Sequence, residues 1–371
     1  MGFYTYNLYF LDMDDQFIYR LYKPGDETGI LDLLKLSFAE WTAIEKTLDH
    51  WRWKYLKTPI GTDIVVAEDN GKIIGVSHNM ELRLKLGSSM ILTHFGADTA
   101  THPDYRGKGI FGKIVEVLEK IRIEKQLGLE YAASSNPAVH KEWQKRGRTI
   151  FPHPISIMVR IKNVDLHLKM RPIDNPLVLK TGYYVKNTMR IINKTLKPRI
   201  STSDNFVIEE VTNFKKANNE FWEKIKLHYN FILEKNSDYL NWRYSDPVSK
   251  YIIKKATSNE ELLGFSVIKI SEKTDYPEAF IYELITLPNR PDVALALFNE
   301  CCKTCDKMKI NIIYYMVPKG NSYSKIANKT GFVDSERELF ITCHIIGTQA
   351  DFKVMEKSSP NQIYFTYSDK L

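Results

Sequence analysis

The chain has 371 residues with a formal net charge of +7, and 26% of its residues are charged. This length accommodates two domains, and the ordinary balance of apolar, charged and Gly/Pro residues excludes a disordered or collagen-like chain. The sequence has no apolar run of about 18 residues, which excludes a transmembrane helix, and Asp12, Asp14 and Asp15 interrupt the apolar N-terminal stretch, which excludes a signal peptide.

The first 160 residues alternate predicted strands with predicted helices. One helix is expected after the Pro-Gly-Asp turn, with Asp26 as its candidate N-cap, and a second carries Trp51, Trp53 and Tyr55. These three aromatic residues either line an acceptor groove or pack in the core. Strands are expected over residues 17–23, 62–68, 72–81, 89–100 and 129–134, and closing strands reach residue 160. The pattern predicts an α/β domain with a mixed sheet.

Residues 101–112 read Thr-His-Pro-Asp-Tyr-Arg-Gly-Lys-Gly-Ile-Phe-Gly and join a predicted strand to a long helix over 110–126. Glycines in such a turn let backbone N–H groups approach phosphate oxygens, and the helix N-terminus adds a partial positive charge. Arg106 and Lys108 add full positive charges. The turn lacks both the Gly-Lys-[Ser/Thr] of a P-loop and the Gly-x-Gly-x-x-Gly of a dinucleotide site. It therefore predicts a site for the phosphates of a different ligand.

Residues 161–200 form a basic connector. They hold nine Lys or Arg and two Asp, a surplus of seven positive charges that equals the net charge of the whole chain. Residues 176–198 mix apolar, basic and tyrosine residues, so they form a peripheral membrane contact, a site for an anionic acceptor, or an interdomain helix with one solvated face. No nucleic-acid-binding motif accompanies them, so we expect no nucleic-acid partner.

Several landmarks of the first domain recur in residues 201–371. Trp-Lys-Tyr-x-x-x-Pro at 53–59 returns as Trp-Arg-Tyr-x-x-Pro at 242–247, and each copy is followed by two strands with an early glycine in the second. An Asn, a helix and a Lys-x-Gly ending also recur, at 136–147 and 321–331. We interpret the chain as two copies of one α/β module, over 1–160 and 201–371.

The second copy differs at the phosphate turn. Its strand over 279–287 leads to Pro288-Asn289-Arg290-Pro291-Asp292 and then to a helix that reaches Met308. Prolines remove backbone N–H donors instead of presenting them. We therefore expect this copy to have lost pyrophosphate binding and either to complete an acceptor pocket or to stabilise the first copy.

Four cysteines in a chain of this length do not form a disulfide framework, so we expect a reduced, cytoplasmic protein. Cys301, Cys302 and Cys305 cluster on a predicted helix. They are either small buried apolar residues or half of a zinc or redox site, with Cys343 and His344 as distant candidates.

Pro103, Tyr105, Arg106 and Gly109 match motif A of the GNAT acyltransferase superfamily, although Phe111 stands where that motif has a small residue. With the repeated Trp-[Lys/Arg]-Tyr element and the C-terminal Tyr-Phe-Thr-Tyr-Ser-Asp, the chain resembles two-module GNAT proteins associated with amino-sugar and surface-polysaccharide metabolism. The resemblance implies tandem GNAT-like modules. It also implies an acetyl-CoA-dependent N-acyltransferase that acts on a primary amine of a small molecule, such as an amino sugar, without a metal.

The same resemblance implies a set of cofactor-binding residues. The turn would hold the pyrophosphate, the strand edge before it would pair with the pantetheine amides, and the Asn after the buried strand would contact the cofactor. The set comprises Ala100, Thr101, Arg106, Gly107, Lys108, Gly109, Ile110, Phe111, Gly112 and Asn136.

Transfer to an amine requires a general base near this strand. Asp98 and His94 are the candidates, and their spacing places them on one strand face if no bulge intervenes. His94 has a near-neutral reference pKa, whereas Asp98 would need a raised pKa or a water relay. Alternatively, Asp98 braces the turn and His94 is a core residue. Trp143 stands where the family has a Tyr that acts as general acid toward the leaving thiolate. The general acid is therefore unassigned, with His140 as a substitute candidate.

Two other functions stay open at this stage. Enzymes that transfer peptides from aminoacyl-tRNA also pair two such modules, but they generally lack a CoA turn. The second alternative is a non-catalytic protein that binds CoA or docks on a membrane.

Overall fold

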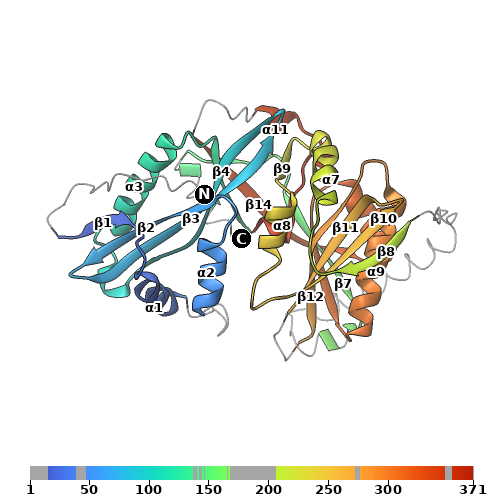
Figure 1. Ribbon diagram of the computed structural model, residues 1–371, viewed down its shortest axis with the longest axis horizontal. Helices are drawn as coiled ribbons and strands as arrows, with labels where there is room; N and C mark the ends of the chain where they lie inside the picture. The colour runs from blue at the N-terminus through green and yellow to red at the C-terminus, as the bar shows by residue number, and fades with distance from the viewer. Residues whose placement is uncertain are drawn as a thin grey trace.

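The computed structural model describes residues 16–38, 47–136, 140–141, 144–145, 147–164, 166–167, 206–271, 276–346 and 353–370. In this part of the chain, two α/β lobes lie side by side and one 14-stranded sheet runs through both (Figure 1). The strands follow the order β1-β2-β3-β4-β5-β14-β7-β13-β12-β11-β10-β8, while β6 pairs with β14 and β9 with β3. The predicted mixed α/β architecture is confirmed.

The N-terminal lobe has antiparallel strands β1 to β4, with β5 parallel to β4. Helices α1 and α2 cover one face of its sheet and α3 covers the other (Figure 1). Successive strand residues point to opposite faces, so Val66 packs with the α1 and α2 side while Val65 packs with α3. The bounds are β1 (Ile18–Leu21), α1 (Glu27–Ser37), α2 (Leu48–Leu56), β2 (Gly61–Asp69), β3 (Lys72–Leu86), β4 (Ser89–Thr101), η1 (Pro103–Tyr105), α3 (Ile110–Glu124), β5 (Leu129–Ser134), β6 (Thr149–Ile150) and β7 (Ile155–Ile161).

The C-terminal lobe repeats this order. Strands β10, β11 and β12 are antiparallel, and α9 connects β12 to a parallel neighbour, β13. The registers also correspond, because Gly75 lies opposite Thr101 and Gly264 lies opposite Thr286. The bounds are β8 (Val207–Val211), α7 (Ala217–Ile225), η2 (Lys226–His228), β9 (Phe231–Leu233), α8 (Ser237–Arg243), β10 (Lys250–Ser258), β11 (Glu261–Ile270), β12 (Glu278–Thr286), α9 (Pro291–Lys307), β13 (Ile312–Pro318), α10 (Ser322–Thr330), β14 (Val333–Ile345), α11 (Lys353–Lys357), η3 (Pro360–Gln362) and η4 (Tyr367–Asp369).

The two lobes exchange their closing strands. Strand β7 follows the N-terminal lobe in the chain, yet it pairs with β13 of the C-terminal lobe. Strand β14 pairs first with β7 and then, over Phe340–Ile345, with β5 of the N-terminal lobe. No local pattern in the sequence indicates this exchange, since the pattern predicts only that closing strands follow the first copy. As a result, one cluster of buried side chains spans both lobes.

The repeated aromatic element forms the contact between the lobes. The indole N–H of Trp53 donates to the carbonyl of Trp242 at 2.8 Å, and the indole N–H of Trp242 donates to the carbonyl of Trp53 at 3.0 Å. Their rings stack with centroids 5.7 Å apart. These reciprocal contacts join α2 to α8. Trp51 and Tyr55, from the same helix, are buried.

Asp26 precedes α1 as predicted, but its side chain does not cap the helix. Its carboxylate binds the guanidinium of Arg20 at 2.7 and 2.8 Å and accepts a hydrogen bond from the Lys23 N–H. Asp26 is therefore the N-cap residue, as predicted, but its side chain is the counter-charge of the buried Arg20 on β1.

All four cysteines are buried, and none of them is in a disulfide bond. Three of them pack from α9 into the core of the C-terminal lobe, and burial raises the pKa of Cys305 to about 12. The Cys305 thiol therefore stays protonated, as expected of a core residue. The segment 176–198 lies outside the described residues. Among the helices that the structure describes, none is long and apolar enough to cross a membrane.

Candidate active site

A cavity of about 640 Å³ opens where β4 gives way to α3. Most of its wall comes from the turn that the sequence predicted to bind phosphate, together with the end of β4 and the end of α1. The lining residues are Ser37, Phe38, Thr99, Ala100, Thr101, Tyr105, Arg106, Gly107, Gly109, Ile110, Phe111 and Gly112.

The turn depends on its glycines for its backbone path. Gly107 and Gly109 have φ angles of 79° and 77°, in the left-handed region that favours glycine, and Gly109 is the N-cap of α3. Because a glycine N-cap has no side chain to accept from the first-turn N–H groups, these donors remain for a ligand. Gly75 on β3 allows the helix to begin here, since a Cβ at this position would lie 2.8 Å from Ile110.

The predicted cofactor residues do not all reach this cavity. Arg106 borders it and has no ion-pair partner among the described residues. The Lys108 ammonium instead lies 4.8 Å from the ring centroid of Tyr105, outside the lining. Asn136 is exposed and also outside the lining, although its carbonyl accepts the His140 N–H, as at the start of the predicted helix.

A β-bulge separates the two predicted bases. Val76 lies opposite Ala100, but His78 lies opposite Ala97, so β4 has one extra residue at Asp98–Thr99. Asp98 has a φ angle of 41°. The bulge turns its carboxylate toward α2, where it accepts hydrogen bonds from Tyr55 and, at 2.9 Å, from Lys54.

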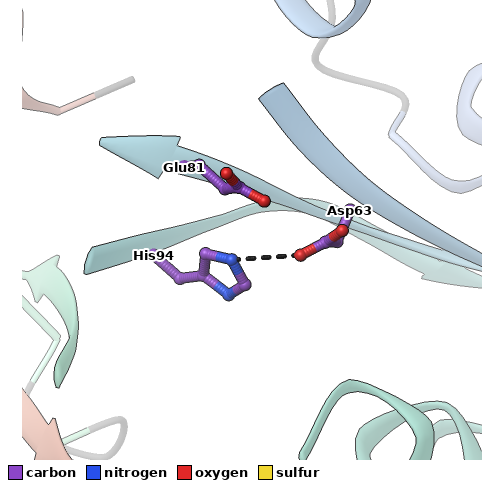
Figure 2. Close-up of side chains that lie close together, drawn as sticks. All are labelled: Asp63, Glu81 and His94. Carbon is purple, nitrogen blue, oxygen red and sulfur yellow. Dashed lines mark ion pairs between the residues drawn. The ribbon is translucent and has the colours of Figure 1, made fainter. Parts of the chain in front are cut away.

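His94 points to the opposite face of the sheet and is fully buried. Its imidazole lies 3.2 Å from the carboxylate of Asp63, beside Glu81 (Figure 2). The condition under which His94 and Asp98 would share a face is therefore not met, because the bulge shifts the alternation of side chains along the strand. His94 borders neither this cavity nor the smaller one between the lobes.

Asp63, Glu81 and His94 present atoms that could ligate a metal within 4.8 Å of one another. The ammonium of Lys125 already bonds to both carboxylates, at 2.6 Å from Asp63. Burial raises the pKa of Asp63, but His94 and Lys125 outweigh burial and hold it below the usual range. We interpret this cluster as a buried ion network under the end of α3.

The electrostatics of Asp98 keep it ionised at neutral pH. Burial raises its pKa, but the Lys54 ammonium and the Tyr55 hydroxyl outweigh burial, so the pKa lies below the usual range. Burial raises the pKa of Tyr55 well above its usual value, so this phenol stays a donor. A carboxylate in this state attracts an ammonium group but is a weak base.

His78, which the sequence did not single out, holds the bulge. Burial lowers its pKa to about 4, so it is neutral. Its Nε2 accepts the indole N–H of Trp51 at 3.1 Å, which leaves Nδ1–H to donate to the Asp98 carbonyl at 3.0 Å. Only its position opposite the bulge, which the sequence does not show, would have identified it.

A second cavity of about 240 Å³ lies between the lobes. Its lining residues are His50, Trp53, Lys54, Asp98, Trp242, Arg243, Asp246, Tyr251, Lys269, Tyr282 and Lys370. Asp98 thus borders the second cavity while its neighbours Thr99 and Ala100 border the first. Strand β4 passes between the two cavities. Trp143 lies outside the described residues, and the His140 imidazole is within 2.8 Å of the Ser134 carbonyl, outside both cavities.

Residues 18–142 match the family model described as an acetyltransferase (GNAT) domain. Similar solved structures include a protein from Enterococcus faecalis V583 named as a probable N-acyltransferase, with 12% identity, 90% of this chain and 74% of that chain covered, and a TM-score of 0.61. A GCN5-related N-acetyltransferase from Anabaena variabilis has 11% identity and a TM-score of 0.60, with 90% of this chain and 73% of that chain covered.

Saccharomyces cerevisiae N-myristoyltransferase with bound myristoyl-CoA gives 9% identity, covers 90% of this chain and 84% of that chain, and has a TM-score of 0.56. Identities this low establish a shared fold and nothing finer. The search of curated proteins found no match.

Proposed function

We propose that this protein is an N-acyltransferase that uses acyl-CoA, with acetyl-CoA as the first donor to test, because residues 18–142 match the model of the GNAT acetyltransferase domain. The acceptor is a primary amine of a small molecule. An amino sugar is the acceptor class suggested by the resemblance of the sequence. Asp98 is the residue that we assign to the amine, and we assign no catalytic role to His94.

The observation that carries the proposal is the position of β4 between the two cavities. CoA would occupy the first cavity, with its pyrophosphate at the N-terminus of α3 and beside Arg106. Its thioester would then lie at the bulge. A bulge leaves backbone groups outside the regular ladder, and an N–H in this position can bind the oxyanion of the tetrahedral intermediate.

The amine would enter through the second cavity, where the ionised carboxylate of Asp98 attracts it as an ammonium ion. The amine loses one proton, to Asp98 or through water to solvent, and its nitrogen attacks the thioester carbon. The C–N bond forms and the C–S bond breaks, and the nitrogen gives up its second proton, which passes through water to the departing CoA thiolate. Lys54 and Tyr55 position the carboxylate throughout.

The first test is thermal unfolding of the purified protein with and without acetyl-CoA. A ligand at about 100 times its dissociation constant adds about 2.7 kcal/mol to the free energy of unfolding, which gives a clear rise in Tm. Initial rates with a panel of amines then test transfer. A protein that shows no shift with acetyl-CoA would contradict the proposal and favour the aminoacyl-tRNA alternative. A shift without turnover of any amine would favour a non-catalytic CoA-binding protein.

A further inference from the structure

The second cavity has an uneven distribution of charge. Its lining includes four cationic side chains and two carboxylates. Lys54 pairs with Asp98, and Asp246 pairs with His50 at 3.0 Å. Arg243, Lys269 and Lys370 have no carboxylate within ion-pair distance among the residues that the structure describes. The wall contributed by the C-terminal lobe is therefore positive.

Arg243 is the most buried cation of this wall. It is 5% exposed, and its Nε–H donates to the Ser368 carbonyl at 3.1 Å. Its two terminal nitrogens have no hydrogen-bond partner in the described part of the chain, and neither of them is fully enclosed by protein atoms. A buried guanidinium is costly unless its donors are used, and these donors border the cavity.

Tyr282 holds two of the cations at one place. The guanidinium of Arg243 and the ammonium of Lys269 each lie 5.5 Å from the centroid of its ring. Lys269 also lies 5.9 Å from the ring centroid of Tyr251. The aromatic faces stabilise both cations without neutralising them, so the positive potential persists at the cavity surface.

Equivalent positions of α2 and α8 carry cations with different partners. Arg243 occupies in α8 the position that Lys54 occupies in α2, next to the reciprocal tryptophans. Lys54 is neutralised by Asp98 from β4, whereas Arg243 faces Tyr282 from β12. The cavity thus combines one carboxylate from the N-terminal lobe with a cationic wall from the C-terminal lobe.

We propose that Arg243, Lys269 and Lys370 form an anion subsite, so that the acceptor is an amine that also carries a carboxylate or phosphate group. The amine lies at Asp98 and the anionic group lies at the cationic wall. The cavity of about 240 Å³ is smaller than the ~300–1,000 Å³ of drug-sized sites, which fits a compact acceptor. The role of this molecule as acceptor rests on the proposed function, but binding of the anion does not.

The test is calorimetric titration of the full chain at low ionic strength with two matched pairs of amines. One pair is glucosamine 6-phosphate and glucosamine, and the other is β-alanine and β-alaninamide. In at least one pair, the member with the anionic group should bind about 10-fold or more tightly than the member without it, as expected for a charge-assisted contact. The pair with the larger difference identifies phosphate or carboxylate as the anionic group.

Lys269→Gln should remove most of this preference and leave the affinities for glucosamine and β-alaninamide unchanged. Lys269 is only half-buried, so its replacement is compatible with folding, and exposed Lys370 provides a second variant, Lys370→Gln. Lys303→Gln, on the exposed surface of α9, removes the same charge elsewhere and should change nothing. Equal affinities within both pairs, no binding of either anionic amine, or a preference that survives Lys269→Gln would overturn the proposal.

Two further measurements separate this proposal from the proposed function. Arg106→Glu should leave the affinity for glucosamine 6-phosphate unchanged; if the affinity falls, the phosphate binds at the turn of the first cavity and the anion subsite is refuted. The Tm shift with acetyl-CoA, measured on the same Lys269→Gln protein, should persist. Absence of that shift in the unaltered protein would contradict the proposed function while leaving the result on the anion subsite intact.

Discussion

The two lobes place the same helix after the same strand, yet they treat its N-terminus differently. In the N-terminal lobe, Gly109 caps α3 and Arg106 has no ion-pair partner in the described part of the chain. In the C-terminal lobe, Pro291 begins α9, and Asp292 in the first turn binds Arg290 at 2.7 Å. A helix N-terminus attracts an anion, and here the chain supplies its own carboxylate. This gives a physical reason for the predicted loss of pyrophosphate binding in the second copy.

The C-terminal ends of α3 and α9 also differ in the charged groups that they contact. Beneath the end of α3, Lys125 bridges the carboxylates of Asp63 and Glu81. At the end of α9, a part-exposed ion pair joins Asp306 to Arg160 at 2.9 Å, and Cys301 and Cys305 pack in the apolar core beneath the helix. The end of the helix is therefore held by a buried ion network in the N-terminal lobe and by a part-exposed ion pair in the C-terminal lobe.

The largest expected effect sharpens this second contrast. Lys125→Met should lower the free energy of unfolding by about 3–5 kcal/mol at neutral pH, because it leaves buried carboxylates without their cation. In the unaltered protein the pKa of Asp63 is lowered, so its contribution is present above the unfolded pKa and is lost as pH falls through the folded pKa.

In Lys125→Met the pKa of Asp63 should rise, so the variant should regain stability on acidification. Urea denaturation at neutral and mildly acidic pH measures both effects. Cys305→Ser under α9 is the comparison and should cost less, without this pH dependence. A Lys125→Met protein whose deficit is the same at both pH values would contradict the assignment.

The contrast between the turns is tested by charge reversal at matched positions. Arg106→Glu should weaken acetyl-CoA binding by about 100-fold, because a charge-assisted hydrogen bond to phosphate is lost and repulsion replaces it. Arg290→Glu, in the second copy, should leave the affinity unchanged. Isothermal titration with acetyl-CoA measures both variants, and equal losses would show that the copies are not functionally distinct.

Asp98→Asn should lower kcat by about 100-fold while the affinity for acetyl-CoA stays the same, as expected if the carboxylate acts on the amine. Tyr55→Phe removes one hydrogen bond that lowers the pKa of Asp98. The acidic limb of the pH–rate profile should therefore move to higher pH in this variant. An acidic limb at the same pH in Tyr55→Phe would mean that another group controls it.

The smallest expected effect is that of Gly112→Ala, which should change stability and ligand binding in opposite directions. Gly112 lies in α3, and a Cβ added at this position would have no atom within 4 Å, so Gly112→Ala should raise stability by about 0.5–1 kcal/mol. The added methyl group borders the first cavity and should weaken acetyl-CoA binding. Thermal unfolding with and without the ligand measures both, and unchanged binding would place the pyrophosphate away from this residue.

The sequence predicted the elements because their signals are local. Period-two strands, the glycine turn and the repeated Trp-[Lys/Arg]-Tyr element all lie within short windows. The bulge at Asp98 carries no such signal, since an aspartate in a left-handed conformation replaces the glycine that would have marked it. Its consequence, the separation of Asp98 from His94, was therefore not predictable.

Other features depend on residues far apart in the chain. The cationic wall combines α8, β11 and a position close to residue 371, and each of its residues alone resembles an ordinary surface or core position. The sequence also did not predict which way the Lys108 side chain points, because the contact of its ammonium with the ring of Tyr105 is a feature of the folded chain. The sequence thus indicated the first cavity well and the second one poorly.

The exchange of strands has a consequence for how the protein is made. Strand β5 must wait for Phe340–Ile345, which emerge from the ribosome only after the second lobe has been synthesised. Until then, the nascent N-terminal lobe presents an unpaired strand edge that can associate with other chains. For the same reason, neither lobe can be deleted without removing a paired strand from the other.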